Sequence, residues 1–205
     1  MRPTELKRLT RDAEDRSRAA AARFATTAVA DGAADVAYGF ADSPFGRLLV
    51  AMGRRGLILV EYPGRDVDAA LAEVAARLSP RILESASGTD AIRRELDEYF
   101  DGRRKRFEVR PDLSLVRGFN RSVLQHTARI PYGSVTTYGR MAAAAGSPRA
   151  ARATGNALGS NPIPIVVPCH RVVHADGGLG GYTGGIERKV TLLRLEGALD
   201  DAPEE

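Results

Sequence analysis

The residues best suited to covalent chemistry lie around the only cysteine of the chain, Cys169. A thiol is an effective nucleophile only as the thiolate, which needs a nearby cation, a base or a helix N-terminus. His170 is the candidate base, and because neighbouring side chains on an extended chain point apart, we expect a water molecule between the two. A base also needs an acid that orients it. Glu196, at the end of a helix expected over residues 186–195, is the candidate because helical spacing places it on the apolar side.

These residues also have explanations without catalysis. A single cysteine in a soluble protein is more often a small buried apolar residue. His170 and His174 have the i, i+4 spacing of a helical metal-binding pair, but the prolines, valines and glycines around them disfavour a helix. One thiol leaves no set of thiolates for a structural zinc site, so we expect no metal and no cofactor. Glu196 is equally well explained as a carboxylate that ends a helix.

Prolines and glycines delimit the elements that must position the thiol. Three prolines within residues 162–168 exclude a helix there, so the chain should be extended or turning as it reaches the cysteine. Further upstream, a helix is expected over residues 120–130, ended before a Pro-Tyr-Gly sequence.

The sequence that follows this helix has the pattern of a helix-turn-helix motif. Thr137 can cap a helix over residues 138–145, and Gly146 suits the position just after its end. Ser147-Pro148 then supplies a second cap and a first-turn proline for a helix that reaches about residue 158. A glycine-ended helix followed within two residues by a proline-opened helix is typical of this motif.

Positive charge is concentrated in the same part of the chain. Residues 118–197 contain nine arginines and lysines and three acidic residues, while the whole chain has a formal net charge of only +4. The second helix of the motif offers small residues, Ala151 among them, around Arg149 and Arg152. From this segment alone, tight packing against another helix is the more common explanation. The charge instead favours a shallow approach to the DNA minor groove, with Arg152 wedged into the base stack.

The N-terminal half predicts an α/β unit. Two apolar runs, over residues 46–52 and 56–62, predict a β-hairpin. Helices are expected over residues 67–78 and 89–100, and a short strand over residues 107–110.

These patterns divide the chain into three segments. Residues 1–34, rich in alanine, arginine and aspartate, predict an exposed helix or a frayed extension without identifiable chemistry. We expect an N-terminal α/β domain over residues 35–110 and a C-terminal domain over residues 111–205, with the linker within residues 103–117.

Length and composition exclude several classes of protein. A chain of 205 residues with 43% hydrophobic and 27% charged residues is ordinary for a soluble globular protein and unlike a disordered or collagen-like chain. No apolar run approaches the ~20 residues of a membrane helix, and the first residues lack the apolar core of a secretory signal. We therefore expect a cytoplasmic protein with no membrane partner.

Taken together, the motifs resemble the O6-alkylguanine-DNA alkyltransferases, also called methylated-DNA–protein-cysteine methyltransferases. The resemblance covers residues 118–197, and the hairpin is similar to the looser N-terminal domain of that family. It is carried by Tyr138, by Gly-Ser-Pro-Arg-Ala-Ala-Arg at 146–152, by Asn-Pro-Ile-Pro at 161–164, by Val-Pro-Cys-His-Arg-Val-Val at 167–173, by Gly-Tyr-Thr-Gly-Gly at 181–185 and by Leu-Glu-Gly at 195–197.

The resemblance implies a fold and an activity. The fold would be mixed α/β (α+β), with a small N-terminal β-sheet and helices of the ribonuclease H-like kind and a mostly helical C-terminal domain with a helix-turn-helix. The activity would be DNA repair by direct reversal: an alkyl group moves irreversibly, once per molecule, from O6-alkylguanine, and also O4-alkylthymine, to the cysteine after nucleotide flipping. The partner would be double-stranded DNA carrying the lesion, bound by a monomer. A non-catalytic lesion-binding or regulatory protein is the alternative.

The resemblance also implies a role for each site residue. Cys169 would accept the alkyl group, His170 would act as its base through water, and Glu196 would orient the histidine. Asn161 would brace the turn beneath the thiol, and Tyr138 would donate to guanine N3. The remaining roles concern substrate and DNA: the carbonyls of Cys169 and Val172 would take the exocyclic amine, Tyr182 and Thr183 would line the pocket, Arg152 would fill the gap left by the flipped nucleotide, and Ala151, Thr137 and Arg149 would also contact DNA.

Overall fold

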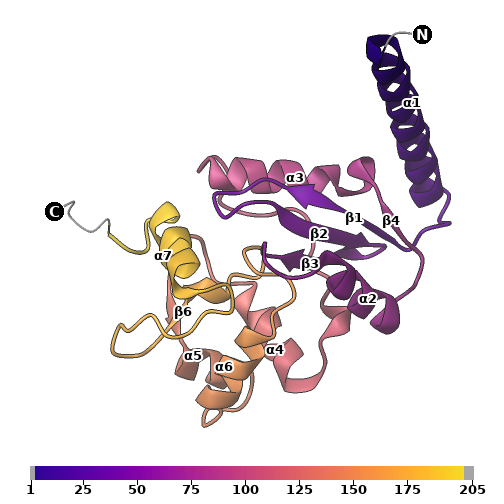
Figure 1. Cartoon of the computed structure of the whole chain (residues 1–205). Coiled ribbons are helices and arrows are strands. Elements are labelled where there is room, and N and C mark those ends of the chain that lie inside the picture. The colour runs from indigo at the N-terminus through magenta and orange to yellow at the C-terminus, as the bar shows by residue number, and fades with distance from the viewer. Residues whose placement is uncertain (1–2, 201–205) are drawn as a thin grey trace.

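A computed structural model describes residues 3–200 and has a small β-sheet followed by a mostly helical half (Figure 1). The mixed α/β fold expected from the sequence is confirmed. Within the described residues no helix is long and apolar enough to cross a membrane.

The N-terminal sheet has four strands in the order β3-β2-β1-β4. The expected hairpin is present as β2 (Leu48–Gly53) and β3 (Gly56–Glu61), which pair antiparallel. β1 (Val36–Ala41) pairs antiparallel with β2, and β4 (Ile82–Glu84) pairs parallel with β1. The sequence analysis missed β1 and β4, because a glycine interrupts the first and the second has only three residues.

Both faces of the sheet are buried, so its central strands are continuously apolar. Leu48 and Val50 face one core together with α3 (Ala86–Phe100), whereas Leu49 and Ala51 face the other core together with α2 (Val67–Arg77). Both helices were expected. They lie on opposite sides of the sheet (Figure 1).

The strand expected over residues 107–110 is wrong. The backbone N–H groups of Glu108 and Val109 donate to the buried carboxylate of Glu95, at 2.8 and 3.2 Å, instead of to a neighbouring strand. The nearest sheet contact is one isolated bridge between Leu57 and Pro111.

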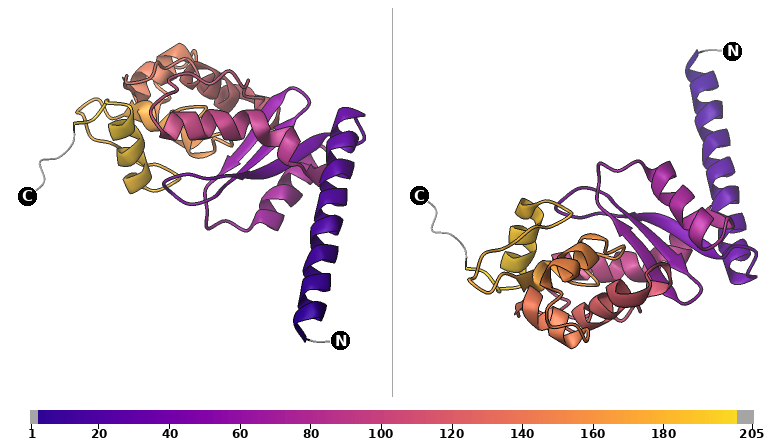
Figure 2. Two further views of the ribbon diagram at one scale, coloured as in Figure 1. Left: turned by 90° about the horizontal axis from the view of Figure 1, so that it is seen from above. Right: turned by 90° about the horizontal axis from the view of Figure 1, so that it is seen from below.

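α1 (Pro3–Ala30) forms the first segment and projects from the body of the molecule (Figures 1 and 2). Its last turns pack against α3, and Ala25 and Ala28 in these turns are buried. Thr26 Oγ1 lies 2.9 Å from Ser87 Oγ at the start of α3. The described side chains of residues 11–24 are exposed, so of the two expectations for this segment, an exposed helix or a frayed extension, the exposed helix is confirmed.

The C-terminal half contains the helix-turn-helix. α4 (Gly118–Thr127) replaces the helix expected over residues 120–130, and it packs on both α5 (Tyr138–Ala144) and α6 (Ala151–Gly159). Thr137 Oγ1 caps α5 by accepting from the Arg140 N–H at 3.2 Å, and Gly146 has a positive φ of 83° just after the end of the helix. Both expectations are confirmed.

The start of α6 differs from its prediction. Ser147 and Pro148 do not open the helix; they lie in a separate turn in which the Ala150 N–H donates to the Ser147 carbonyl at 2.9 Å. α6 begins only at Ala151. Arg149 therefore lies in the turn between the helices and not on the second helix.

One hydrophobic core joins the two halves. Leu57, Ile92 and Tyr99 from the N-terminal half belong to the same buried cluster as Leu124 and Ile163 from the C-terminal half. Between α3 and α4, the 3-10 turn η1 (Leu113–Leu115) contributes Leu113 to this cluster. The remaining elements, β5 (Thr136–Thr137), the 3-10 turn η2 (Cys169–Arg171), β6 (Val172–Val173) and α7 (Ile186–Leu195), complete this half.

The close approach of α3 to β1 leads to a stability prediction. A Cβ atom on Gly88 of α3 would lie 2.5 Å from the Cβ of Ala37 in β1, so Gly88→Ala should overpack this contact and lower the free energy of unfolding by ~1–3 kcal/mol in urea titrations. Gly139 in α5 is the matched control, because a Cβ there meets nothing within 4 Å. Gly139→Ala should instead add about 0.5–1 kcal/mol. Equal stabilisation by both substitutions would contradict the packing of α3 on β1.

Candidate active site

Cys169 begins the 3-10 turn η2, so the extended conformation expected for Cys169 and His170 is wrong. The Cys169 N–H donates to the Val167 carbonyl at 2.8 Å, and the Arg171 N–H donates to the Pro168 carbonyl at 3.0 Å. The turn separates the two side chains. Cys169 lines a cavity, whereas His170 is fully buried behind it.

Asn161 holds the turn from the side of the sulfur. Its Nδ2 donates to the Val167 carbonyl at 2.8 Å and to Cys169 Sγ at 3.2 Å, and its Oδ1 accepts from the Ile163 N–H at 3.0 Å. Every polar atom of this amide is thus committed to the segment that leads to the thiol.

Glu196, the C-cap residue of α7, is 4% exposed and gathers four hydrogen bonds. Its Oε1 lies 2.9 Å from His170 Nε2 and accepts from the Tyr99 hydroxyl at 2.6 Å. Arg171 donates to both carboxylate oxygens, at 2.7 and 2.8 Å. Burial raises the pKa of Glu196, but the hydrogen bonds from His170 and Arg171 outweigh it and lower the pKa to about 2. The carboxylate is therefore charged near neutral pH.

His170 is neutral in this setting. Burial lowers its pKa, although the hydrogen bond to Glu196 acts in the opposite direction. A neutral imidazole carries one proton, and the acceptor Glu196 requires it on Nε2. The lone pair is then on Nδ1, which is buried and has no hydrogen-bond partner among the described residues. This orphaned acceptor can take a proton.

The thiol itself is protonated at rest. Burial raises the pKa of Cys169, and the hydrogen bond from Asn161 and the charge of Lys189 only partly oppose this effect. The sulfur must therefore lose its proton as it reacts, because little thiolate is present beforehand.

Lys189 on α7 is fully buried and ties two segments together. Its Nζ donates to the Val172 carbonyl at 2.6 Å and to the Leu179 carbonyl. Burial lowers the pKa of Lys189 to about 8. The Val172 carbonyl, expected to accept from guanine, thus already accepts from this ammonium group.

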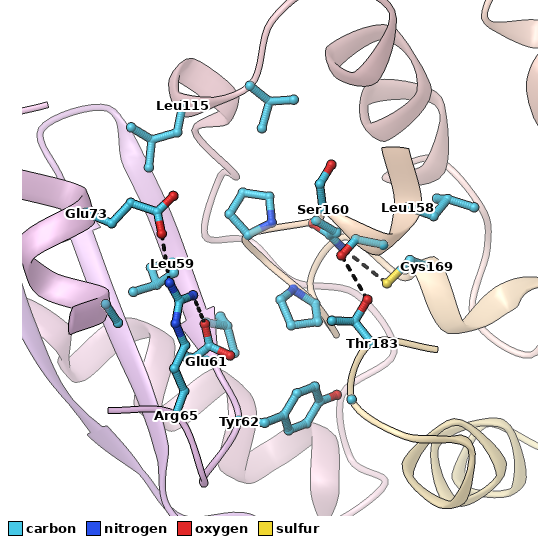
Figure 3. A pocket seen from close by; sticks show the side chains of 18 of the residues that line it. Leu59, Glu61, Tyr62, Arg65, Glu73, Leu115, Leu158, Ser160, Cys169 and Thr183 are labelled. Carbon is cyan, nitrogen blue, oxygen red and sulfur yellow. Dashed lines mark hydrogen bonds and ion pairs between the residues drawn. The ribbon is translucent and has the colours of Figure 1, made fainter. Parts of the chain in front are cut away.

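Cys169 lies between two cavities of about 660 Å³ each. The first opens beside the helix-turn-helix, and the expected site residues Tyr138, Ala151, Arg152, Tyr182 and Thr183 line it. The second lies between the N-terminal sheet and the C-terminal half (Figure 3).

The two cavities share Tyr182 and Thr183 as walls. Thr183 Oγ1 donates to the Gly159 carbonyl at 2.8 Å, and this bond fastens the glycine-rich loop, residues 177–185, to the end of α6. Tyr138 packs its ring 5.1 Å from that of His174, so His174 is a wall residue here and not part of a helical pair.

The DNA-contact residues expected from the sequence separate into two groups. Arg152 and Ala151, in the first turn of α6, are exposed at the mouth of the first cavity. Arg152 forms no ion pair with the residues that the structure describes. Arg149 and Thr137 do not line either cavity.

The sequence analysis missed three residues that support this site. Arg171 adjoins the catalytic candidates in sequence, but nothing local indicates that it bonds Glu196. Lys189 precedes the buried Leu192 and Leu193 by three and four residues. This spacing places all three on the same apolar face of the helix, so the burial of Lys189 could have been predicted from the sequence. Tyr99 lies 97 residues from Glu196, so no local pattern predicts their contact.

Comparisons with known proteins match most of the chain to one family. The DNA binding domain of 6-O-methylguanine DNA methyltransferase matches residues 118–198, and the ribonuclease-like domain of the same family matches residues 36–113. A methylated-DNA–protein-cysteine methyltransferase of Mycolicibacterium paratuberculosis is 40% identical over 163 residues, which are 78% of this chain and 92% of that protein. One of Methanosarcina acetivorans is 37% identical over 164 residues, 78% of this chain and 98% of that protein.

Solved structures give the same result. The crystal structure of Mycobacterium tuberculosis O6-methylguanine methyltransferase superposes with a TM-score of 0.66 at 36% identity, covering 82% of this chain and 96% of that one. The structure of Mycobacterium tuberculosis OGT in complex with DNA also has a TM-score of 0.66 at 36% identity, covering 78% and 92%. The chain therefore belongs to the 6-O-methylguanine DNA methyltransferase family.

Proposed function

We propose that this protein repairs O6-alkylguanine, and by the same chemistry O4-alkylthymine, in double-stranded DNA by moving the alkyl group onto Cys169. The observation that supports this most directly is a single thiol in the cavity beside the helix-turn-helix, backed by a buried His170–Glu196 pair. Relatives named as methylated-DNA–protein-cysteine methyltransferases, and one solved in complex with DNA, make duplex DNA the expected partner.

The reaction is a displacement at the alkyl carbon. A bond forms between the sulfur and that carbon while the bond from carbon to guanine O6 breaks, and its electron pair leaves with guanine. The thiol proton passes through a water molecule to His170 Nδ1, whose lone pair has no hydrogen-bond partner among residues 3–200. It is finally returned to guanine, which lacks a proton on N1 while it is alkylated. The imidazolium formed on the way lies against the charged Glu196.

Other residues assist the leaving group and the flipped nucleotide. The Tyr138 hydroxyl donates to guanine N3 and so stabilises the negative charge that develops on the base. Tyr182 and Thr183 enclose the purine, and the carbonyls of Cys169 and Val172 receive its exocyclic amine. Arg152 occupies the space that the nucleotide leaves in the stack, and Ala151, Arg149 and Thr137 contact the backbone near it.

The product limits the protein to one reaction. A thioether has no leaving group that ordinary side chains can displace, so the alkylated molecule stays alkylated. Each chain carries the complete set of site residues, which supports a monomer as the acting species. We place this action in the cytoplasm, as the sequence leads us to expect.

The decisive test is transfer of label from DNA. Duplex DNA with radiolabelled O6-methylguanine should pass its methyl group to the peptide that contains Cys169, up to one equivalent per chain. Cys169→Ala should abolish transfer and still bind the DNA. More than one equivalent per chain would refute the single-use scheme. Binding without any transfer by the parent protein would instead favour a non-catalytic lesion-binding protein.

The proposed role of Arg152 in the base stack can be tested by comparing transfer from duplex and from single-stranded DNA. Because filling the stack offsets a few kcal/mol of unstacking, Arg152→Ala should slow methyl transfer from duplex DNA about tenfold or more. Transfer from single-stranded DNA, where little stacking is lost, should change much less. Arg94→Ala is the control, since it removes the same charge from an exposed position on α3. Equal rates on duplex for Arg152→Ala and the parent would exclude the wedge role.

Glu196 should control the acid stability of the protein. The pKa of its carboxyl is about 2 in the fold against a usual 4.5, so its contribution to folding is complete above pH 4.5 and is lost as the pH falls toward 2. Glu196→Gln leaves Arg171 buried without a counter-ion and should cost about 3–5 kcal/mol at pH 7 in urea unfolding. The difference from the parent should shrink between pH 4.5 and 2. Glu187→Gln, at an exposed position of α7, should change neither quantity, and a constant difference across this range would contradict the assignment.

A further inference from the structure

A third cavity, of about 1030 Å³, lies apart from the two that meet at Cys169. Two of its walls are the segment after α3, residues 105–111, and the segment after α4, residues 128–132. None of the described residues lines both this cavity and either of the other two. The turn η2 stands between them, because Cys169 at its start lines the first two cavities and Arg171 at its end lines the third.

The lining of the third cavity is strongly cationic. Among the described residues, those that line it with a charge are the acidic Glu108 and the basic Lys105, Arg106, Arg110, Arg129 and Arg171. The carboxylate of Glu108 lies 3.7 Å from the guanidinium of Arg104, and Arg171 is paired with Glu196. The other four basic residues are exposed and form no ion pair within residues 3–200. The cavity therefore presents four positive charges that the fold does not neutralise.

Two of these charges belong to a basic run whose other members are paired. Arg103 forms an ion pair with Asp101 at 2.6 Å, and Arg104 forms one with Glu98 at 2.8 Å. Lys105 and Arg106 follow directly in sequence and line the cavity. The chain thus neutralises the two cations that do not line the cavity and leaves the two on its wall without an acidic partner.

The walls that carry these charges are held by the rest of the fold. The buried carboxylate of Glu95 accepts the two backbone N–H groups described above, in the middle of the segment after α3. The Leu57 N–H of β3 donates to the Arg110 carbonyl at 2.9 Å in the same segment. On the facing wall, Arg171 donates to the Ile130 carbonyl at 2.5 Å. Because the backbone is already ordered, binding of an anion here would cost little further ordering.

The chemistry of the lining favours phosphate groups and not a stacked base. Arginine and lysine side chains are the groups that neutralise the phosphates of nucleic acids. The ring of Tyr132, which also lines the cavity, is occupied: the Lys105 ammonium lies 5.7 Å and the Arg171 guanidinium 5.8 Å from its centroid. The four unpaired charges come from two segments of the chain, and the cavity is far larger than one phosphate group. An extended polyanion therefore fits it better than a free phosphate.

We propose that the third cavity binds the phosphodiester backbone of a second DNA segment, in addition to the segment bound at the helix-turn-helix. This contact reads no base sequence, because phosphates carry none. It goes beyond the proposed function, since it involves neither the thiol nor the lesion.

The test counts the duplexes that one chain binds. The full-length protein is titrated with a lesion-free, hairpin-closed duplex of about 10 base pairs, one helical turn, and the complexes are measured by sedimentation. The variant Lys105→Gln/Arg129→Gln removes one cation from each wall of the third cavity. The variant Arg94→Gln/Arg103→Gln is the matched control, because it removes two charges from exposed positions that line none of the three cavities.

The parent protein and the control should bind two duplexes per chain. Lys105→Gln/Arg129→Gln should weaken one of the two binding events about tenfold or more. The slope of the logarithm of its affinity against the logarithm of salt concentration should fall by about 2, one for each lost phosphate contact. The other event should keep its affinity in this variant, and Arg152→Ala should weaken that event alone.

Three results would overturn the proposal. One is a single duplex per chain in the parent protein, and another is equal weakening by the cavity variant and the control. The third is calorimetric binding of orthophosphate or a nucleoside triphosphate that the cavity variant loses, without a second duplex, because the ligand would then be a free phosphate compound. Failure of the proposed function is distinguishable from all three. A protein that transfers no methyl group but binds two duplexes, one of them through the third cavity, lacks only the alkyl transfer.

Discussion

The site depends on one buried negative charge. A carboxylate removed from water is strongly unfavourable unless donors surround it, and removal of one partner leaves the other charge uncompensated. Glu196 meets this requirement with His170, Arg171 and Tyr99. These donors come from η2 and from α3, so the same interaction that makes the charge tolerable fixes the turn that presents the thiol. It also fixes the histidine tautomer, because an acceptor on one ring nitrogen forces the lone pair onto the other.

This arrangement separates the charge states of three neighbouring groups. Glu196 stays charged, His170 stays neutral, and burial keeps Cys169 protonated. A buried neutral thiol reacts slowly with small electrophiles in solution. In the proposed reaction, attack becomes favourable only where the sulfur can pass its proton toward His170 as the new bond forms. The fold therefore keeps the thiol protonated until a substrate is bound, and the thiolate forms only as the reaction proceeds. This suits a side chain that can react only once.

Local signals explain what the sequence predicted and contacts between distant residues explain what it missed. The cap at Thr137 and the glycine that ends α5 follow from rules that act within four residues. The start of α6 was misplaced because Ser147-Pro148 suits a turn as well as a first helical turn. Residues 107–110 look like a strand, but Glu95, which is distant in sequence, takes the hydrogen bonds that a sheet would use. The partners of Glu196 and Tyr182 in the N-terminal half have no periodic pattern to reveal them.

Those missed contacts change the role of the N-terminal half. Three of its groups reach the active site: Tyr99 donates to Glu196, Tyr62 pairs with Tyr182, and the Val60 N–H donates to the Pro162 carbonyl at 2.8 Å, next to Asn161. Each acts on a different support of the thiol, namely the acid, the pocket wall and the brace beneath the turn. A C-terminal half alone would keep every residue that the family motifs contain and lose one partner from each of these supports. The N-terminal half is therefore part of the structure that supports the candidate active site, through contacts made by Val60 of β3, by Tyr62 just after it and by Tyr99 of α3.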